Sequence, residues 1–117
     1  MKKIINIFIL LLTLALFTAC SSVSDEELII AREAVKNGAI IVDVRTREEF
    51  IQKHIDGAIN LPIEAIMKGS INLPKDKELV LYCRTGSRSS VSAKVLREKG
   101  WTVYDVATQD DWEREIK

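Results

Sequence analysis

A cysteine followed by a short polar loop is the part of this sequence best suited to chemistry. The apolar run 79–82 ends at Cys83, and a loop with Gly86 at its centre leads into a segment with helical spacing. A buried strand would therefore deliver the cysteine to the carboxyl edge of a sheet, and the glycine would let backbone N–H groups of the loop point inward. Such groups form an anion-binding nest, to which a helix start adds positive potential. Both features favour the nucleophilic thiolate.

The residues after the cysteine complete this predicted anion-binding cradle. They combine two guanidinium groups, three hydroxyl groups and the glycine: Arg84, Thr85, Gly86, Ser87, Arg88 and Ser89. We expect Arg84 to attract an anionic substrate, whereas Arg88 either does the same or turns inward to brace the loop. The simpler alternative is a buried cysteine before an ordinary loop. Two arginines, a glycine and serines directly behind the cysteine make that alternative the weaker one.

A second pair of charged residues is predicted at the same edge of the sheet. The apolar run that begins at Ala39 ends around Asp43, and Arg45 follows two residues later. We expect supporting roles, in which Asp43 pairs with an arginine near the loop and Arg45 caps or bridges neighbouring backbone. Two alternatives stay open for the pair, a surface salt bridge that ends a strand and direct contact with substrate.

Strand and helix signals alternate along the chain. Apolar runs predict strands over 39–44, 58–61, 79–82 and 102–106. Capping residues and helical spacing predict helices over 25–36, 47–53, 63–68 and 89–99, and a last helix capped by Asp110 and Asp111. The apolar side of the helix over 89–99 is predicted to be Val91, Ala93, Val95 and Leu96. The alternation predicts an α/β fold, a small parallel sheet flanked by helices on both faces, with ligands at the carboxyl ends of the strands.

The first twenty residues are predicted to be a lipoprotein signal peptide. Lys2 and Lys3 precede an apolar stretch over 4–17, which is too short for an ordinary membrane span. The segment 17–22 resembles a bacterial lipobox, in which Cys20 would be lipidated and become the mature N-terminus. We therefore expect a signal peptide over 1–20, a linker over 21–23 and one domain over 24–117. The domain would be exported and anchored to a membrane by lipid, on the periplasmic or cell-surface side. An uncleaved anchor or an ordinary secretory signal would also export it.

Composition narrows the possible functions. The chain has 17 basic and 17 acidic residues, and without Lys2 and Lys3 the remainder is slightly acidic, so we expect no nucleic-acid partner. If Cys20 carries lipid, Cys83 is the sole free thiol. His54 is the single histidine, and we interpret it as a hydrogen-bonding loop residue rather than a base. One histidine and one free cysteine predict no metal site.

Three motifs together resemble the rhodanese family of single-domain sulfurtransferases, over about 24–112. They are Val42-Asp43-Val44-Arg45 with Glu48-Glu49-Phe50 behind it, His54-Ile55-Asp56-Gly57-Ala58-Ile59-Asn60-Leu61-Pro62, and Tyr82-Cys83-Arg84-Thr85-Gly86-Ser87-Arg88-Ser89. The resemblance implies a rhodanese-like fold and a reaction that needs no cofactor. The Cys83 thiolate would take a sulfane sulfur from thiosulfate or a persulfide donor, become a persulfide, and pass the sulfur to a thiol or cyanide acceptor. The implied partners are that acceptor and a small anionic sulfur donor.

Two other functions use related chemistry. One is that of a cysteine phosphatase or arsenate reductase. Four residues separate Cys83 from Arg88, one fewer than in the cysteine-phosphatase signature. The shorter loop argues against this function, because a smaller cradle has less room for phosphate. A persulfide carrier or binding module without turnover would differ from an enzyme in the acceptor that meets the persulfide.

The segment 107–111 replaces the Gly-Gly turn usual in the rhodanese family. Its larger and acidic residues are expected to narrow the pocket or repel anionic donors.

Overall fold

Helices and strands alternate along residues 23–117, the part of the chain that the computed structural model describes. The helices are α2 (Asp25–Lys36), α3 (Arg47–Gln52), α4 (Ile63–Lys68), α5 (Ser87–Glu98) and α6 (Gln109–Glu113). The strands are β1 (Ile40–Asp43), β2 (Ile59–Asn60), β3 (Leu79–Cys83) and β4 (Val103–Thr108). The predicted signal peptide over 1–20, with Cys20, and most of the predicted linker lie outside the described residues.

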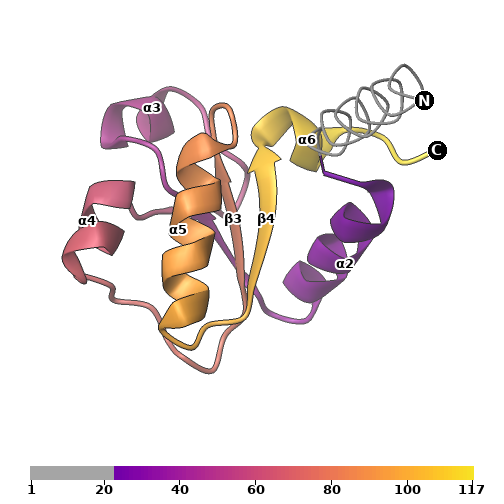
Figure 1. The fold of residues 1–117 in the computed structure, drawn as a ribbon. Coiled ribbons are helices and arrows are strands. Elements are labelled where there is room, and N and C mark those ends of the chain that lie inside the picture. The colour runs from indigo at the N-terminus through magenta and orange to yellow at the C-terminus, as the bar shows by residue number, and fades with distance from the viewer. Residues whose placement is uncertain (1–22) are drawn as a thin grey trace, which may run out of the picture.

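The four strands form one parallel sheet in the order β2-β1-β3-β4. Helices α2 and α6 lie on one side of the sheet, and α4 and α5 lie on the other (Figure 1). An ion pair joins α3 to the first turn of α5. This architecture confirms the predicted α/β fold with helices on both faces. Because neighbouring strands run parallel, the ends of β1 and β3 meet at one edge, where Asp43 pairs in register with Tyr82.

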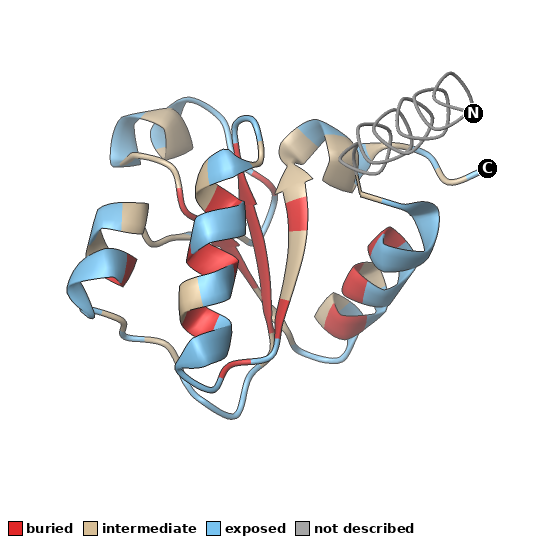
Figure 2. Ribbon diagram, viewed as in Figure 1, coloured by how far each residue is buried: buried red, intermediate tan, exposed pale blue. Residues whose placement is uncertain are grey.

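Strand β3 is the centre of the hydrophobic core. All five of its residues are buried (Figure 2). Leu79, Leu81 and Cys83 face the cluster formed with α4 and α5, whereas Val80 and Tyr82 face the cluster formed with α2. Alternation of side chains between the two faces of a strand explains this division. It also explains why the run is apolar throughout, since a strand in a sheet covered on both faces buries every side chain.

Two capping boxes fix the starts of α2 and α3, as the sequence predicts. The Ser24 hydroxyl accepts from the Glu27 N–H at 3.1 Å, and the Ser24 N–H donates to the Glu27 carboxylate at 3.2 Å. Thr46 and Glu49 make the same reciprocal pair at the start of α3. Each box satisfies two backbone donors that a helix start otherwise leaves without a partner. The box in α3 therefore places Glu49 firmly at the carboxyl edge of the sheet, directly after β1.

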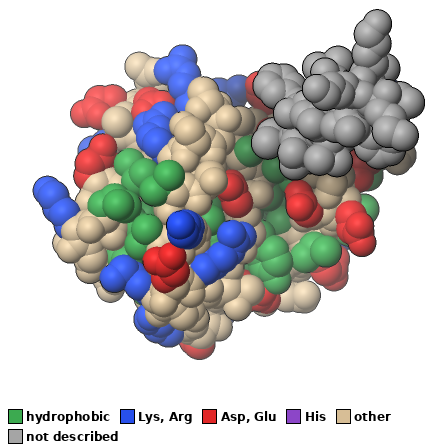
Figure 3. Space-filling view, in the orientation of Figure 1, with side chains coloured by type: hydrophobic (Ala, Val, Ile, Leu, Met, Phe, Trp, Pro, Cys, Tyr) green, Lys and Arg blue, Asp and Glu red, His purple; other side chains and the backbone are tan. Residues whose placement is uncertain are grey.

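The prediction for the helix after Cys83 was wrong in two respects. Helix α5 begins at Ser87 rather than at residue 89, because Gly86 takes a positive φ of 99° and ends the loop sooner. Val91 belongs to the exposed side, at 47% exposure, while Ser89 and Ser92 are buried with Ala93. Small residues on the buried side let α5 pack closely on the sheet. On the outer surface, hydrophobic side chains gather over α4 and α5 (Figure 3).

The end of the chain also differs from the prediction. Strand β4 extends to Thr108 through an irregularity opposite β3, so that Leu81 pairs with Asp105 and Cys83 pairs with Thr108. Thr108, not Asp110 or Asp111, caps α6: its hydroxyl accepts from the Asp111 N–H at 3.1 Å. Strand β2 is shorter than predicted and spans Ile59–Asn60. The extra length of β4 brings Thr108 opposite Cys83.

Residues 23–117 lack two features, a membrane-spanning helix and a cluster of metal ligands. No helix in this range is long and apolar enough to cross a membrane. No three His, Cys, Asp or Glu side chains in the described part of the chain are arranged to hold a metal ion.

Candidate active site

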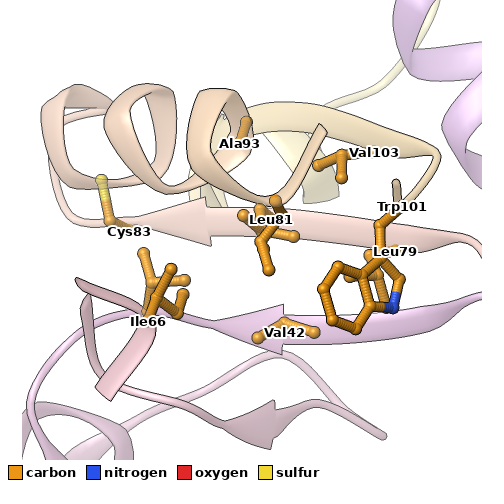
Figure 4. Close-up of a cluster of buried hydrophobic side chains, with 10 residues drawn as sticks. Val42, Ile66, Leu79, Leu81, Cys83, Ala93, Trp101 and Val103 are labelled. Atoms are coloured by element: carbon orange, nitrogen blue, oxygen red, sulfur yellow. The ribbon is translucent and has the colours of Figure 1, made fainter. Parts of the chain in front are cut away.

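Cys83 lies at the last position of β3, with its side chain directed toward the first turn of α5 (Figure 4). Its Sγ accepts hydrogen bonds from the backbone N–H groups of Gly86 at 3.0 Å and Ser89 at 3.3 Å. The side chain is 2% exposed. A sulfur held by two fixed N–H dipoles at the start of a twelve-residue helix is in a field that favours negative charge. The predicted nest therefore exists, although only two of its N–H groups contact the sulfur.

The hydroxyl groups of the loop divide into an inner one and two outer ones. Ser89 is fully buried, and its hydroxyl donates to the Gly86 carbonyl at 3.1 Å while its oxygen lies 3.5 Å from Cys83 Sγ. Thr85 and Ser87 are exposed and share a hydrogen bond of 3.2 Å between their hydroxyl oxygens. Ser89 thus closes the loop behind the sulfur, and Thr85 and Ser87 stiffen its outer side.

Arg88 braces the loop, which is one of the two roles considered for it from the sequence. Its guanidinium donates to both carboxylate oxygens of Glu49 on α3, at 2.8 and 3.0 Å. The hydrogen bond from Arg88 lowers the pKa of Glu49 from 4.5 to about 2, and the same bond raises the pKa of Arg88. A bidentate pair of this kind fixes orientation as well as charge. It connects the helix after β1 to the helix that carries the cysteine loop.

Asp43 and Arg45 form a buried pair below the loop. Asp43 is fully buried and accepts from the Arg45 side chain at 2.7 to 3.0 Å and from the Tyr82 hydroxyl at 2.8 Å. The prediction that Asp43 pairs with an arginine near the loop is met by Arg45 itself, and neither Arg84 nor Arg88 contacts it. The alternative of a surface salt bridge is wrong, because Asp43 is inaccessible to solvent. Arg45 also donates to the Lys53 carbonyl at 2.5 Å, which is the predicted bridging of backbone.

The surroundings of this pair are polar and connected. Burial raises the pKa of Tyr82, whose oxygen accepts from the Ile55 N–H at 3.0 Å. The hydrogen bond to Asp43 raises the pKa of Arg45. Asn60 donates to the carbonyls of Asp43 and Arg45 at 3.0 and 2.9 Å. These contacts hold the ends of β1 and β2 and the loop after α3 in one network, and they leave no oxygen of Asp43 directed at Cys83.

His54 lies in the loop after α3 and contacts Phe50 of that helix. Its Nδ1 is 2.8 Å from the Phe50 carbonyl, and its ring stacks on the Phe50 ring with 3.9 Å between centroids. It is therefore a hydrogen-bonding loop residue in this structure.

Sequence reasoning missed Glu49, Tyr82 and Asn60 as parts of the site. For Glu49 a signal existed, since its capping box directly follows the strand that ends at the same edge as Cys83.

The end of β4 forms one wall beside the cysteine loop. Ala107 has a φ of 64°, the left-handed region that is unusual for a residue other than glycine, and its N–H donates to the Asp105 side chain at 3.0 Å. A Cβ atom on Gly86 would lie 3.2 Å from the Ala107 Cβ. Ala107 thus lies against the loop, while the expectation that 107–111 narrows the pocket or repels anionic donors stays a prediction.

Arg84 is the cation of the loop that remains available to a ligand. Its side chain is exposed, and it makes no ion pair within residues 23–117. A buried nucleophilic sulfur, two N–H donors and one exposed guanidinium suit covalent catalysis on a small anionic substrate.

Known proteins resemble this chain in both sequence and fold. The chain is 40% identical over 74 residues to a tRNA sulfurtransferase of Desulfurococcus amylolyticus; the match covers 63% of this chain but only 14% of that protein. It is 35% identical over 77 residues to a sulfurtransferase of Allochromatium vinosum, covering 66% of this chain and 72% of that one. A rhodanese-related protein of Thermoplasma volcanium has a similar structure, with a TM-score of 0.63 and 28% identity over 73% of this chain and 85% of that one.

The family assignment follows from these similarities and from the geometry of the loop. The profile of the rhodanese-like domain matches residues 27–108, which include β1, the cysteine loop and β4. Sulfurtransferases among the relatives support sulfur transfer as the general activity. The chain belongs to the rhodanese-like domain family.

Proposed function

We propose that this protein transfers sulfane sulfur through a persulfide on Cys83. One observation carries the proposal: the backbone N–H groups of Gly86 and Ser89 are directed at Cys83 Sγ, at 3.0 and 3.3 Å. Backbone N–H donors aimed at a sulfur stabilise negative charge that develops on it during a displacement. Once a second sulfur is attached, the same loop would surround the outer, negatively charged sulfur of the persulfide.

The proposed reaction has two displacement steps. In the first, the Cys83 thiolate attacks the outer sulfur of thiosulfate; the new S–S bond forms while the S–S bond of thiosulfate breaks, and sulfite leaves with the bonding pair. In the second, a thiolate or cyanide attacks the outer sulfur of the persulfide. The product is a new persulfide or thiocyanate, and Cys83 leaves as the thiolate. Neither step changes the total charge, and neither requires a general base once the thiolate is present.

The other loop residues would serve these steps in different ways. Exposed Arg84 would attract the anionic donor. Ser89, whose hydroxyl oxygen lies 3.5 Å from Cys83 Sγ, would turn its hydrogen from the Gly86 carbonyl to the sulfur when the sulfur is charged. Thr85, Gly86, Ser87 and Arg88 would maintain the shape of the cradle through their own hydrogen bonds. Asp43 and Arg45 would support the strand end without contacting substrate.

The site of action proposed for the domain is outside the cytoplasm. The apolar segment 4–17 and the lipobox-like segment 17–22 support export, and lipidation at Cys20 would anchor the domain to a membrane on its periplasmic or cell-surface side. Lipid on Cys20 would leave Cys83 as the free thiol of the mature protein. Metabolic labelling with a fatty acid, in the native chain and in Cys20→Ser, tests the anchor.

The experiment for sulfur transfer compares the full chain with Cys83→Ser. The chain is incubated with thiosulfate and cyanide, and thiocyanate is measured alongside the mass of the protein, which increases by one sulfur atom in the persulfide. We expect thiocyanate and the added mass in the native chain and neither in Cys83→Ser. Added mass without thiocyanate would favour a carrier that needs a specific acceptor. Absence of both would overturn the proposal.

A further inference from the structure

The charges around the cysteine loop are mostly compensated. Glu49 pairs with Arg88 at 2.8 Å, and Asp43 pairs with Arg45 at 2.7 Å. Both arginines are partly buried at the carboxyl edge of the sheet. Arg84 is the one arginine of the loop that no carboxylate contacts within the described residues. The cradle therefore offers a ligand one uncompensated guanidinium, not two.

Acidic residues also follow the end of β4, the strand that pairs with the end of β3. Thr108 pairs with Cys83 in the sheet, and α6 starts at the next residue with Asp110 and Asp111 in its first turn. Asp111 accepts from the Thr108 hydroxyl at 2.8 Å. Negative charge lies beside the loop itself at Glu49 on α3. A nearby carboxylate lowers the positive potential of the cradle, and because the interaction energy scales with the charge of the ligand, it weakens the attraction of a doubly charged anion about twice as much as that of a singly charged one.

We propose that Glu49 sets the charge preference of this site: by pairing with Arg88 it lowers the positive potential of the cradle, and so shifts the preference away from dianionic thiosulfate and toward monoanionic sulfane-sulfur donors. The proposal rests on the proposed sulfur transfer at Cys83. Glu49 acts through Arg88 and does not touch the reacting sulfur, so it is a positioning residue that determines specificity. The favoured donors are thiosulfonates and low-molecular-weight persulfides whose only charge is on the outer sulfur.

Thiosulfate and methanethiosulfonate are matched donors for the test. Each presents a terminal sulfur to the Cys83 thiolate. In each case the Cys83–sulfur bond forms as the donor S–S bond breaks, and the bonding pair leaves on sulfite from thiosulfate or on methanesulfinate from methanethiosulfonate. The two donors differ by one unit of charge, two against one. A change in the electrostatic potential of the cradle therefore acts on thiosulfate about twice as strongly as on methanethiosulfonate.

The informative variant is Glu49→Gln, with Glu48→Gln as its control. The amide oxygen of the new glutamine can still accept from Thr46 at the start of α3, so the capping box is kept while the carboxylate charge is lost. Glu48 lies on the same helical turn and is exposed, and it makes no ion pair among residues 23–117. Glu48→Gln therefore removes the same charge from α3 without releasing Arg88.

The measurement is kcat/KM for each donor with cyanide as acceptor. In Glu49→Gln we expect a rise of about fivefold for thiosulfate and about twofold for methanethiosulfonate, so that the ratio shifts toward thiosulfate. Glu48→Gln should leave the ratio unchanged. Glu49→Asp, which keeps the charge, should keep the native ratio even if both rates fall through weaker bracing of the loop. An unchanged ratio in Glu49→Gln, or an equal shift in Glu48→Gln, would overturn the assignment.

The outcomes also separate this inference from the function on which it rests. Thiocyanate from both donors in the native chain, with no change of ratio in Glu49→Gln, would overturn the role of Glu49 alone. No thiocyanate from either donor above the Cys83→Ser background would overturn both. Salt dependence gives a second readout: salt screens the potential of the cradle, so the ratio of kcat/KM for thiosulfate to that for methanethiosulfonate should fall more steeply with added salt in Glu49→Gln than in the native chain. An equal salt dependence of this ratio in the two proteins would contradict the inference.

Discussion

Gly86 and Ala107 lie in direct contact, although they come from the cysteine loop and from the end of β4. A Cβ atom on residue 86 would be 3.2 Å from the Ala107 Cβ, closer than ordinary van der Waals contact. Both residues have positive φ angles, 99° for Gly86 and 64° for Ala107. The loop that holds the sulfur is therefore closed on one side by Ala107, which carries backbone strain that Gly86 does not, and the two positions constrain each other.

Replacing Gly86 with alanine should damage both stability and activity. The positive φ strains any residue with a Cβ atom by about 1 to 2 kcal/mol, and the contact with Ala107 adds to this cost. Since the Gly86 N–H donates to Cys83 Sγ, a displaced loop would also slow persulfide formation. Gly57→Ala is the control, because Gly57 has a φ of 82° but a Cβ atom added there would meet no other atom within 4 Å. Equal losses of unfolding free energy in the two variants would show that the contact with Ala107 adds nothing to the cost of the Gly86→Ala substitution.

Ala107→Gly should stabilise the protein. Ala107 adopts a left-handed conformation that costs a non-glycine residue about 1 to 2 kcal/mol, and glycine recovers this at an entropic cost of roughly 0.5 to 1 kcal/mol. We expect a net gain of about 0.5 to 1 kcal/mol in the free energy of unfolding, measured with urea. A loss of stability would mean that packing of the Ala107 methyl group against the loop outweighs the backbone strain.

Removing the Tyr82 hydroxyl should destabilise the sheet edge below the loop. This hydroxyl donates to buried Asp43 at 2.8 Å and accepts from the Ile55 N–H at 3.0 Å, so Tyr82→Phe leaves two buried groups with a partner missing. The expected cost is about 2 kcal/mol. Tyr104→Phe is the matched control, because Tyr104 is only half-buried and its one side-chain partner is Glu78. A Tyr82→Phe variant as stable as Tyr104→Phe would contradict the role assigned to this network.

The sequence predicts the fold well because each local signal agrees with the packing. Capping boxes at Ser24 and Thr46 and the apolar run before Cys83 need only neighbouring residues to be recognised, and all three are observed. Contacts between distant segments are a different case. The pairs Arg88–Glu49 and Gly86–Ala107 join residues 39 and 21 positions apart, and they depend on how the helices pack on the sheet. The buried side of α5 is a separate case: Ser89, Ser92, Ala93 and Leu96 follow helical spacing, but two of them are serines, which a pattern of apolar residues does not mark.

The Arg88–Glu49 pair should give the protein a defined sensitivity to acid. Hydrogen bonding to Arg88 lowers the pKa of Glu49 to about 2 in the folded state, against 4.5 for the ordinary side chain, so the folded state binds this proton less readily than the unfolded state. The stabilisation is complete above about pH 5 and is lost as the pH falls toward 2. Because the pair is partly exposed to solvent, we expect it to contribute about 1 kcal/mol.

The native chain should therefore exceed Glu49→Gln in unfolding free energy by that amount at pH 7, and the difference should vanish near pH 2. Glu48→Gln should show no such pH-dependent difference, and a constant gap for Glu49→Gln between about pH 7 and pH 2 would contradict the charge-based explanation.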